Sequence, residues 1–266
     1  MSQLSKIPSH IERHTGVDAF SDLSDQDLIQ LANASNGDQN IYSCMIKRRI
    51  AGEPLPYIVG FIELDGIKIK IDKRAYITDP EAIHLINHMK SVLHDLPSSK
   101  VLEVGTGCGS LSFCIQKSVP HHTIVAVDID SNAIDLAKEN ASELKFDIQF
   151  LVSDYFMGLS DDYEPNIVFA DPPWGSEESI YEDDRPVDHY HAMPGISVWP
   201  FKSITGIHEQ IIDEILLKKW SCDLYMNFGM LDDESIQKAL NHAPNHTIYR
   251  PAKNVTIVKI QFLNKN

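Results

Sequence analysis

A glycine-rich turn between an apolar strand and a helix constrains this chain more than any other feature. Residues 100–109 read Lys-Val-Leu-Glu-Val-Gly-Thr-Gly-Cys-Gly, and a helix is expected over residues 110–117. Glycines let the backbone approach a ligand where a Cβ atom would clash, and the first turn of a helix offers unpaired N–H groups. In α/β proteins such a turn opens a nucleotide-sized crevice at the carboxyl end of a strand. The stretch therefore predicts an α/β fold with a cofactor pocket.

The glycine spacing disfavours a nicotinamide or flavin site. The dinucleotide fingerprint would place its third glycine at position 110, where this chain has Ser110. The pattern from Glu103 to Gly109 instead resembles the first motif of class I S-adenosylmethionine (SAM) methyltransferases. This resemblance implies a Rossmann-like seven-stranded sheet and SAM as the cofactor.

Three later apolar runs end in acids, in the order that this resemblance requires. They end at Asp128, suited to grip two ribose hydroxyls, at Asp154, placed like the family's adenine contact, and at Asp171. One such acid could be a helix cap or a turn residue, but four strand ends at the spacing of βαβ units make coincidence a weak explanation. The predicted cofactor contacts are Glu103, Gly105, Thr106, Gly107, Cys108, Gly109, Asp128, Ile129, Asp154, Tyr155 and Asp171.

Length and composition favour a soluble, cytoplasmic protein with one large α/β domain and a small appendage. The chain has 266 residues, and no run approaches the roughly 18 uncharged apolar residues of a membrane span. Its formal net charge of -15, from 38 acids against 23 bases, repels phosphate backbones, so a nucleic-acid partner is not expected. The four cysteines are scattered without metal-ligand spacing, so neither disulfides nor a metal site is expected.

The first quarter of the chain predicts short helices and then a β-hairpin. Ser24 would cap one helix, and a helix over residues 41–50 would end in Lys47-Arg48-Arg49, a cluster that suits the helix dipole or a local ion pair. Asp65-Gly66 is a strong hairpin turn signal. The expected division is a helical region over residues 1–50, a linker with a β-hairpin over 51–76, and a methyltransferase domain over 77–266.

The linker carries a second, more specific resemblance. Arg48-Arg49 is followed by Gly-Glu-Pro-Leu and Tyr-Ile-Val-Gly within residues 52–60, and residues 77–81 read Ile-Thr-Asp-Pro-Glu. These features resemble the PrmC/HemK family, which methylates the amide nitrogen of a glutamine side chain on release factors. That family usually shows Ile-Pro-Arg-Pro-Glu at the last motif, so Asp79 stands in place of its Arg. The resemblance covers roughly residues 45–175.

Residues 171–174, Asp-Pro-Pro-Trp, define the expected acceptor site. Methyl transfer from a sulfonium is an in-line displacement that needs a nitrogen lone pair aimed at the methyl carbon. Family members with Asn-Pro-Pro-Tyr hold the acceptor NH₂ through the Asn oxygen and the first Pro carbonyl, and stack the aromatic ring on the planar group. The resemblance therefore implies Asp171 and the Pro172 carbonyl as hydrogen-bond acceptors, Trp174 as the stacking surface, and Pro173 as a rigid partner in a catalytic set of four.

Asp and Trp in this motif favour a positively charged acceptor. A carboxylate binds an amine or guanidinium better than a neutral amide, and Trp is the best cation–π surface. The main expectation is a SAM-dependent N-methyltransferase acting on a side-chain or small-molecule nitrogen, such as the guanidine or amine of arginine or of a related amino acid or peptide. Three alternatives stay open: a protein-glutamine N5-methyltransferase acting on release factors, an N6-adenine nucleic-acid methyltransferase, which Asp-Pro-Pro-Trp also resembles, and a non-catalytic SAM-binding protein.

The carboxyl-terminal third supplies further candidates. Residues 175–188 hold six acids and one Arg, and predict a solvated loop or a cation-attracting lid. His189, His191 and His208 are candidate bases. An amphipathic helix is expected over residues 206–218, and an antiparallel strand pair over 223–228 and 254–262. The oligomeric state and the number of methyl groups added stay open.

Overall fold

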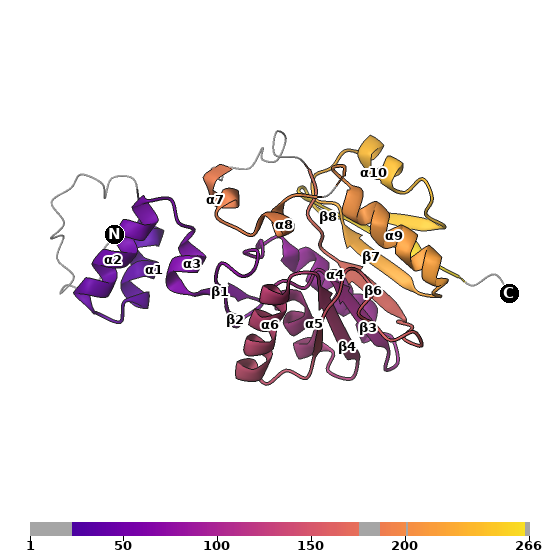
Figure 1. Cartoon of the computed structure of the whole chain (residues 1–266), viewed down its shortest axis with the longest axis horizontal. Coiled ribbons are helices and arrows are strands. Elements are labelled where there is room, and N and C mark those ends of the chain that lie inside the picture. Colours follow the sequence, from indigo (N-terminus) through magenta and orange to yellow (C-terminus); the bar gives the residue numbers. More distant parts are fainter. Residues whose placement is uncertain (1–22, 176–186, 201, 264–266) are drawn as a thin grey trace.

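The computed structural model describes residues 23–175, 187–200 and 202–263. Seven strands build one mixed sheet, with helices on both of its faces (Figure 1). The strands are β3 (Lys100–Val104), β4 (Thr123–Asp128), β5 (Gln149–Val152), β6 (Ile167–Ala170), β7 (Asp223–Asn227), β8 (His246–Ala252) and β9 (Val255–Gln261). The helices around this sheet are α4 (Ala82–His94), α5 (Ser110–Ser118), α6 (Ser131–Leu144), α7 (Val187–His191), α8 (Gly195–Val198), α9 (Gly206–Lys218) and α10 (Asp233–Ala239).

The order of the strands creates a switch point between β3 and β6. The sheet runs β5-β4-β3-β6-β7-β9-β8, so the chain builds outward from β3 on one side and from β6 on the other. β3 and β6 are parallel, and Val104 pairs with Ala170 at their carboxyl ends. At such a point the connections leave in opposite directions and open a crevice above the strand ends. The predicted Rossmann-like seven-stranded sheet is confirmed.

Alternating side chains of the central strand β3 pack into two separate hydrophobic cores, one on each face of the sheet. Val101 belongs to the core under α4, α5 and α6, whereas Leu102 and Val104 belong to the core under α9 and α10. Successive side chains of a strand point to opposite faces, so a strand buried on both faces reads as a continuous apolar run. This double burial holds the carboxyl end of β3 in place.

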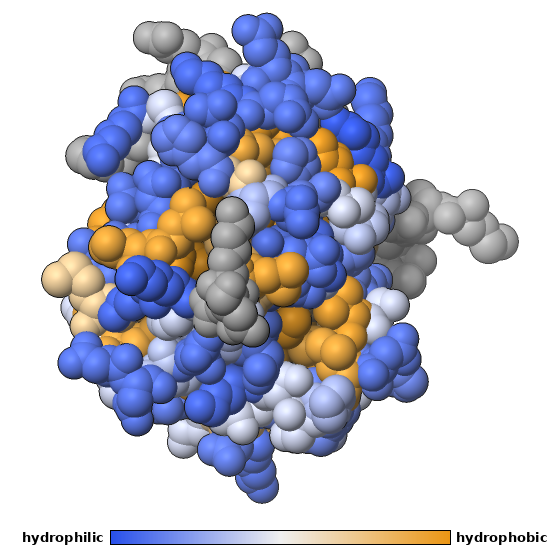
Figure 2. Space-filling view, turned by 90° about the vertical axis from the view of Figure 1, so that its right-hand side faces the viewer, coloured by the Kyte–Doolittle hydropathy of each residue, from blue (hydrophilic) through white to orange (hydrophobic). Residues whose placement is uncertain are grey.

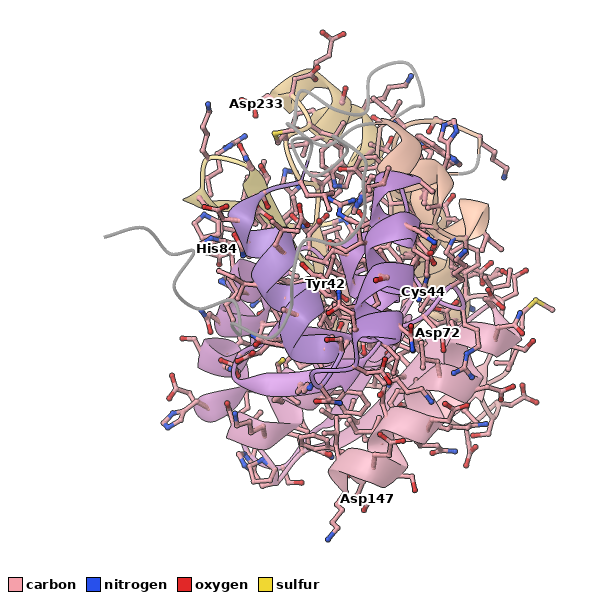
Figure 3. All side chains as sticks on the ribbon, turned by 90° about the vertical axis from the view of Figure 1, so that its left-hand side faces the viewer. Tyr42, Cys44, Asp72, His84, Asp147 and Asp233 are labelled. Atoms are coloured by element: carbon pink, nitrogen blue, oxygen red, sulfur yellow. The ribbon has the colours of Figure 1, made fainter. Side chains whose placement is uncertain are left out.

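Three short helices form a small unit of their own at one end of the molecule (Figure 1). They are α1 (Asp25–Ala34), α2 (Gln39–Ile50) and α3 (Leu55–Val59), and their apolar cluster includes Tyr42, which lies between the helices in Figure 3. Ser24 caps α1 in a reciprocal capping box with Asp27, as predicted. The helical patterns expected before residue 23 lie outside the described residues.

The basic cluster at the end of α2 forms local ion pairs, which confirms that interpretation for two of its members. Arg48 donates from Nε and Nη2 to the two carboxylate oxygens of Glu53, at 2.7 and 2.9 Å. Arg49 Nε donates to Asp27 Oδ1 at 3.1 Å. A bidentate guanidinium–carboxylate pair satisfies the charge locally. The cluster therefore braces the helices and the linker.

The carboxyl-terminal strands agree with the sequence except at one edge. β7 and β9 pair antiparallel as predicted, and α9 has the predicted bounds. β8 forms an additional edge strand that the sequence did not reveal, because its residues are largely exposed and include Pro251. α9 buries Ile211, Ile212 and Ile215. Figure 2 shows this side of the molecule, where apolar patches lie among hydrophilic residues.

The hairpin is held against the cofactor turn by one buried side chain. It consists of β1 (Phe61–Leu64) and β2 (Ile67–Lys70), paired antiparallel on either side of the predicted Asp65-Gly66 turn. Asn140 of α6 is 1% exposed. Its Oδ1 accepts from the Lys70 N–H at 3.1 Å, and its Nδ2 donates to the carbonyls of Lys70 and Cys108 at 3.0 and 3.1 Å. Asn140 thus ties the hairpin to the glycine-rich turn.

Replacing Asn140 with Ala should destabilise the fold, because it leaves three backbone groups without their partner. We expect a loss of about 2 kcal/mol, since each unsatisfied buried polar group costs about 1–3 kcal/mol. Urea unfolding measures the change, with Asn132→Ala on the exposed face of the same helix as the control, expected within about 0.5 kcal/mol of the parent. Equal midpoints for the two variants would contradict the assigned role.

Candidate active site

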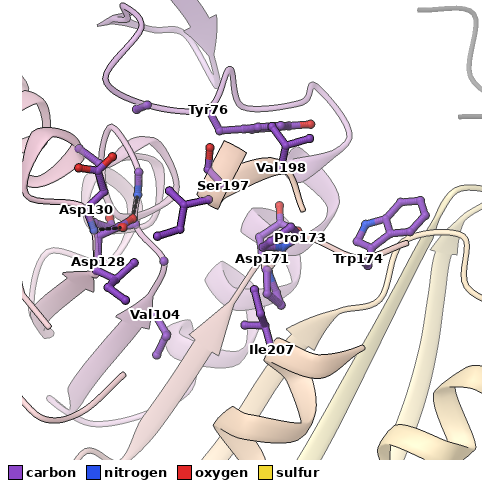
Figure 4. Close-up of a pocket in the computed structure, with 18 of the residues that line it drawn as sticks. Tyr76, Val104, Asp128, Asp130, Asp171, Pro173, Trp174, Ser197, Val198 and Ile207 are labelled. Atoms are coloured by element: carbon purple, nitrogen blue, oxygen red, sulfur yellow. Dashed lines mark hydrogen bonds between the residues drawn. The ribbon is translucent and has the colours of Figure 1, made fainter. Parts of the chain in front are cut away.

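A cavity of about 740 Å³ opens at the carboxyl ends of the central strands (Figure 4). Its walls come from the turns after β3, β4, β5, β6 and β7, and from the segment before α4 and from α8. Eleven of the predicted site residues line it: Gly105, Thr106, Gly107, Asp128, Ile129, Asp154, Tyr155, Asp171, Pro172, Pro173 and Trp174. The structure therefore brings most of the predicted cofactor residues and the whole acceptor motif to one place.

Two glycines after β3 form an open cradle. Gly105 and Gly107 have φ angles of +75° and +55°, and a Cβ atom built on either would meet no protein atom within 4 Å. The left-handed backbone and the missing side chains leave space that the protein itself does not use. The cradle therefore fits a ligand, and SAM is the ligand that the motif predicts.

Asp128 connects the ends of two neighbouring strands. Its Oδ2 accepts the Gly107 N–H at 2.8 Å and its Oδ1 accepts the Asp130 N–H at 3.0 Å, so both oxygens have a fixed direction (Figure 4). Burial raises the pKa of Asp128, and these backbone donors oppose that rise. Each carboxylate oxygen keeps a lone pair for a hydroxyl. This geometry suits the predicted ribose contact.

Three predicted cofactor residues lie behind the cavity wall. Glu103 is 2% exposed and accepts from the hydroxyls of Thr106 and Ser112, and burial raises its pKa to about 7. Cys108 is buried, and Gly109 caps α5 at a point where a Cβ atom would lie 2.7 Å from the Phe113 ring. These residues pack against other protein groups and support the turn from inside.

The acceptor motif begins where β6 ends. Asp171 lies between the Asp128 side of the cavity and Trp174 in Figure 4. Asn227 Nδ2 donates to Asp171 Oδ1 at 2.9 Å. Burial raises the pKa of Asp171 to about 6; the Asn227 hydrogen bond lowers it, and the charge of Asp79 raises it further. A carboxyl with this pKa is mostly ionised at pH 7 and can exchange a proton near neutrality.

Sequence reasoning missed several residues of the walls. Tyr76 and Asp79 lie on the wall before α4, joined by a hydrogen bond from Tyr76 Oη to Asp79 Oδ2 at 3.1 Å. Asn227 lines the cavity at the end of β7. The sequence singled out Asp79, because it stands where the PrmC/HemK family has Arg, but no local sequence feature indicated that Asn227 would lie in the cavity wall.

Acidic residues dominate the ionisable part of the described lining. The basic residues there are Arg74 and Lys202, and Arg74 is engaged by Asp72 and Glu139. The acidic ones are Asp79, Glu81, Asp128, Asp130, Asp154, Asp171 and Glu214. A cavity with this balance favours cationic ligands over free phosphate groups.

None of the three candidate histidines lines the cavity as described. His208 is fully buried on α9, its Nε2 hydrogen-bonds the Asn227 carbonyl at 2.9 Å, and burial lowers its pKa to about 4. His189 and His191 lie on α7, outside the lining. Most of the acidic stretch over residues 175–188 lies outside the described residues.

Gly107→Val should lower SAM affinity by more than about 100-fold, because the side chain would project into the cradle and strain a left-handed backbone. Isothermal titration calorimetry measures the affinity. Gly52→Val is a matched control, since Gly52 also has a positive φ and open space around its Cβ direction but lies at the end of α2. Retained affinity in Gly107→Val would place the cofactor elsewhere.

Comparison with known proteins agrees with this geometry. Residues 77–183 match the family described as methyltransferase small domain. The release factor glutamine methyltransferase of Rhodopirellula baltica is 36% identical over 144 residues, which cover 52% of this chain and 49% of that protein. The enzyme of the same name from Streptococcus pneumoniae is 27% identical over 80% of this chain and 72% of its own length. The match to the first of these spans about half of the relative's length.

Solved structures show the same fold at low identity. The human Mettl16 catalytic domain, solved with an RNA hairpin, superposes with a TM-score of 0.58 at 13% identity, over 85% of this chain and 81% of that one. A 16S rRNA methyltransferase of Thermus thermophilus, solved with AdoMet and guanosine, gives a TM-score of 0.54 at 12% identity, over 76% and 49%. Residues 77–183 thus match a methyltransferase domain, the sheet has the fold of solved methyltransferases, and part of the chain is similar to release factor glutamine methyltransferases of the PrmC/HemK family.

Proposed function

We propose that this chain is a SAM-dependent N-methyltransferase whose acceptor is the side-chain amide nitrogen of a glutamine in a protein of the release factor class. The observation that carries the proposal is the position of the acceptor motif. Asp171 follows the last residue of β6, and Ala170 pairs with Val104, the residue before the glycine cradle. The named relatives support glutamine as the acceptor.

Two oxygens would orient the acceptor nitrogen. The Asp171 carboxylate and the Pro172 carbonyl accept the two amide hydrogens, and this leaves the nitrogen lone pair aimed away from them. The prolines fix φ and therefore preset the direction of the carbonyl. SAM, when bound, supplies an electrophilic methyl group and leaves as S-adenosylhomocysteine. The arrangement is catalysis mainly by positioning.

Asp171 would also handle the charge that develops. As the new N–C bond forms, the nitrogen becomes positive, and a partly buried carboxylate stabilises that charge. The methylated nitrogen then gives up one proton. Asp171, with its pKa raised to about 6, can accept it at neutral pH and pass it to water.

A cationic acceptor, which the sequence favoured, is the second candidate. Its specific support is the pair of carboxylates at Asp79 and Asp171, close enough for the charge of one to raise the pKa of the other. The surplus of acids in the lining supports it too. A purine amine in RNA or DNA has less support, because phosphates would meet the same acidic residues. The neighbours solved with an RNA hairpin and with guanosine share only the fold.

A labelling experiment tests the proposal. The chain is incubated with a purified bacterial release factor and SAM that carries a deuterated methyl group, and peptides are analysed by mass spectrometry. We expect the label on a glutamine side chain. Label on arginine or lysine would favour the second candidate, and no label on the release factor would overturn the proposed acceptor.

Asp171→Asn should separate the two candidates. With a glutamine amide, the Asn oxygen still accepts a hydrogen bond, and the strongly acidic methylated amide can release its proton to water instead of to Asp171. The loss of the carboxylate charge should therefore slow transfer by no more than about tenfold. With a cationic acceptor, the loss of a charge-assisted hydrogen bond of about 1.5–3 kcal/mol should slow transfer about 10- to 100-fold or more. Steady-state rates measure the difference, with Asp147→Asn, an exposed carboxylate outside the cavity lining, as the control.

A further inference from the structure

The end of β7 lies beside the acceptor motif, and the proposed methyl transfer assigns no role to its residues. β6 and β7 are parallel, and Ala170 pairs with Met226, so Asp171 and Asn227 are neighbours at the carboxyl ends of the two strands. Asn227 is 7% exposed and lines the cavity. A polar side chain buried at this point needs partners, and its partners reveal its function.

Three hydrogen bonds fix Asn227 in one orientation. Its Oδ1 accepts the Gly229 N–H at 3.0 Å, which directs the NH₂ end toward Asp171. Its backbone carbonyl meets Nε2 of the buried His208 at 2.9 Å. Because burial lowers the pKa of His208 to about 4, the imidazole is neutral at pH 7, and Nε2 carries the proton that the carbonyl accepts. Neither end of Asn227 is free to turn.

We propose that Asn227 is a positioning residue for the acceptor site, which fixes the Asp171 carboxylate by holding Oδ1 and so presents Oδ2 to the acceptor nitrogen. This inference rests on the proposed N-methyltransferase function. Asn227 Nδ2 lies 2.9 Å from Asp171 Oδ1. A carboxylate that accepts one fixed amide hydrogen cannot rotate freely, and its second oxygen keeps its lone pairs for a substrate.

The same turn also seats the aromatic residue of the motif. A Cβ atom built on Gly229 would lie 2.1 Å from Cε2 of Trp174, so the indole ring lies directly on the glycine backbone. Gly229 has a φ of +55°, a conformation that other residues rarely adopt. The segment from Asn227 to Gly229 thus makes two contacts with the motif. The Asn227 side chain holds the Asp171 carboxylate, and the absence of a side chain at Gly229 leaves room for the Trp174 indole.

The amide donor also affects when Asp171 is ionised. Burial raises the pKa of Asp171, the charge of Asp79 from the segment before α4 raises it further, and the Asn227 hydrogen bond lowers it. The charge of Asp171 in turn raises the pKa of the buried Glu103 of β3. Without the amide donor the Asp171 carboxyl should stay protonated to a higher pH, and a protonated carboxyl is a poorer acceptor for the incoming nitrogen.

The test compares the parent chain with Asn227→Ala, using the release factor as the acceptor. We expect kcat to fall about 10- to 100-fold, because a hydrogen bond to a charged group is lost. The acid limb of kcat against pH should move to higher pH, while SAM affinity measured by calorimetry stays within about twofold. Asn166→Ala is the matched control; its Oδ1 accepts the Lys100 N–H at the opposite end of β6, so its pH profile should not move.

A double-mutant cycle separates positioning from a general structural role. In the Asp171→Asn background the Asn227→Ala change should cost much less, since the group it positions is altered. An unchanged pH profile in Asn227→Ala, equal losses in both backgrounds, or a loss of SAM binding together with activity would each overturn the inference.

Failure of the inference and failure of the proposed function give different results. If the parent chain does not methylate the release factor, the proposed acceptor is wrong. The pKa of the Asp171 carboxyl, followed by carbon NMR in the parent and in Asn227→Ala, still tests the contact without any acceptor. A pKa that rises in the variant supports the inference, and an unchanged pKa contradicts it.

Discussion

The parallel pairing of β3 with β6 is the constraint on which the remaining structure depends. Both strands are buried on both faces, and their register sets Val104 beside Ala170. The glycine turn and the acceptor motif therefore begin at the same level, although they are more than 60 residues apart in the sequence. A cavity between them follows from the opposite directions in which their connections leave. The sheet itself brings the glycine turn and the acceptor motif together.

The acidic groups in the cavity and behind its wall differ in function because their partners differ. Glu103 is enclosed by two hydroxyls and supports the turn, and Asp128 is held by two backbone N–H groups. Asp171 has a side-chain amide as its partner and a second carboxylate, Asp79, near by. Hydrogen-bond donors keep a buried carboxylate ionised, and a neighbouring charge opposes this. The balance at Asp171 leaves it able to take up a proton near neutral pH.

The sequence was sufficient wherever the signal was local. Strand ends at Asp128 and Asp171, the turn at Asp65-Gly66 and the cap at Ser24 each follow from periodicity or from one residue's conformational preference, and the structure has all of them. The resemblance also predicted the sheet correctly. The structure places Glu103, Cys108 and Gly109 of the first motif behind the cavity wall, where they pack inside the turn.

Residues whose function depends on distant partners could not be found in this way. Asn227 is 56 positions from Asp171, and only the pairing of β6 with β7 brings them together. The sequence did not predict β8, because an exposed edge strand lacks the alternation of apolar and polar residues that marks a half-buried strand. The proposed acceptor is a similar case, since it rests on relatives named release factor glutamine methyltransferases, whereas the Asp-Pro-Pro-Trp motif alone favoured a cation.

A crystal structure of the chain with bound S-adenosylhomocysteine tests the central claim most directly. The account predicts that both ribose hydroxyls lie within about 3 Å of the Asp128 carboxylate. It also predicts that the sulfur faces Asp171 across a gap that one methyl group and one nitrogen can fill. A ligand bound away from the glycine cradle, or an Asp171 side chain turned from the sulfur, would contradict it.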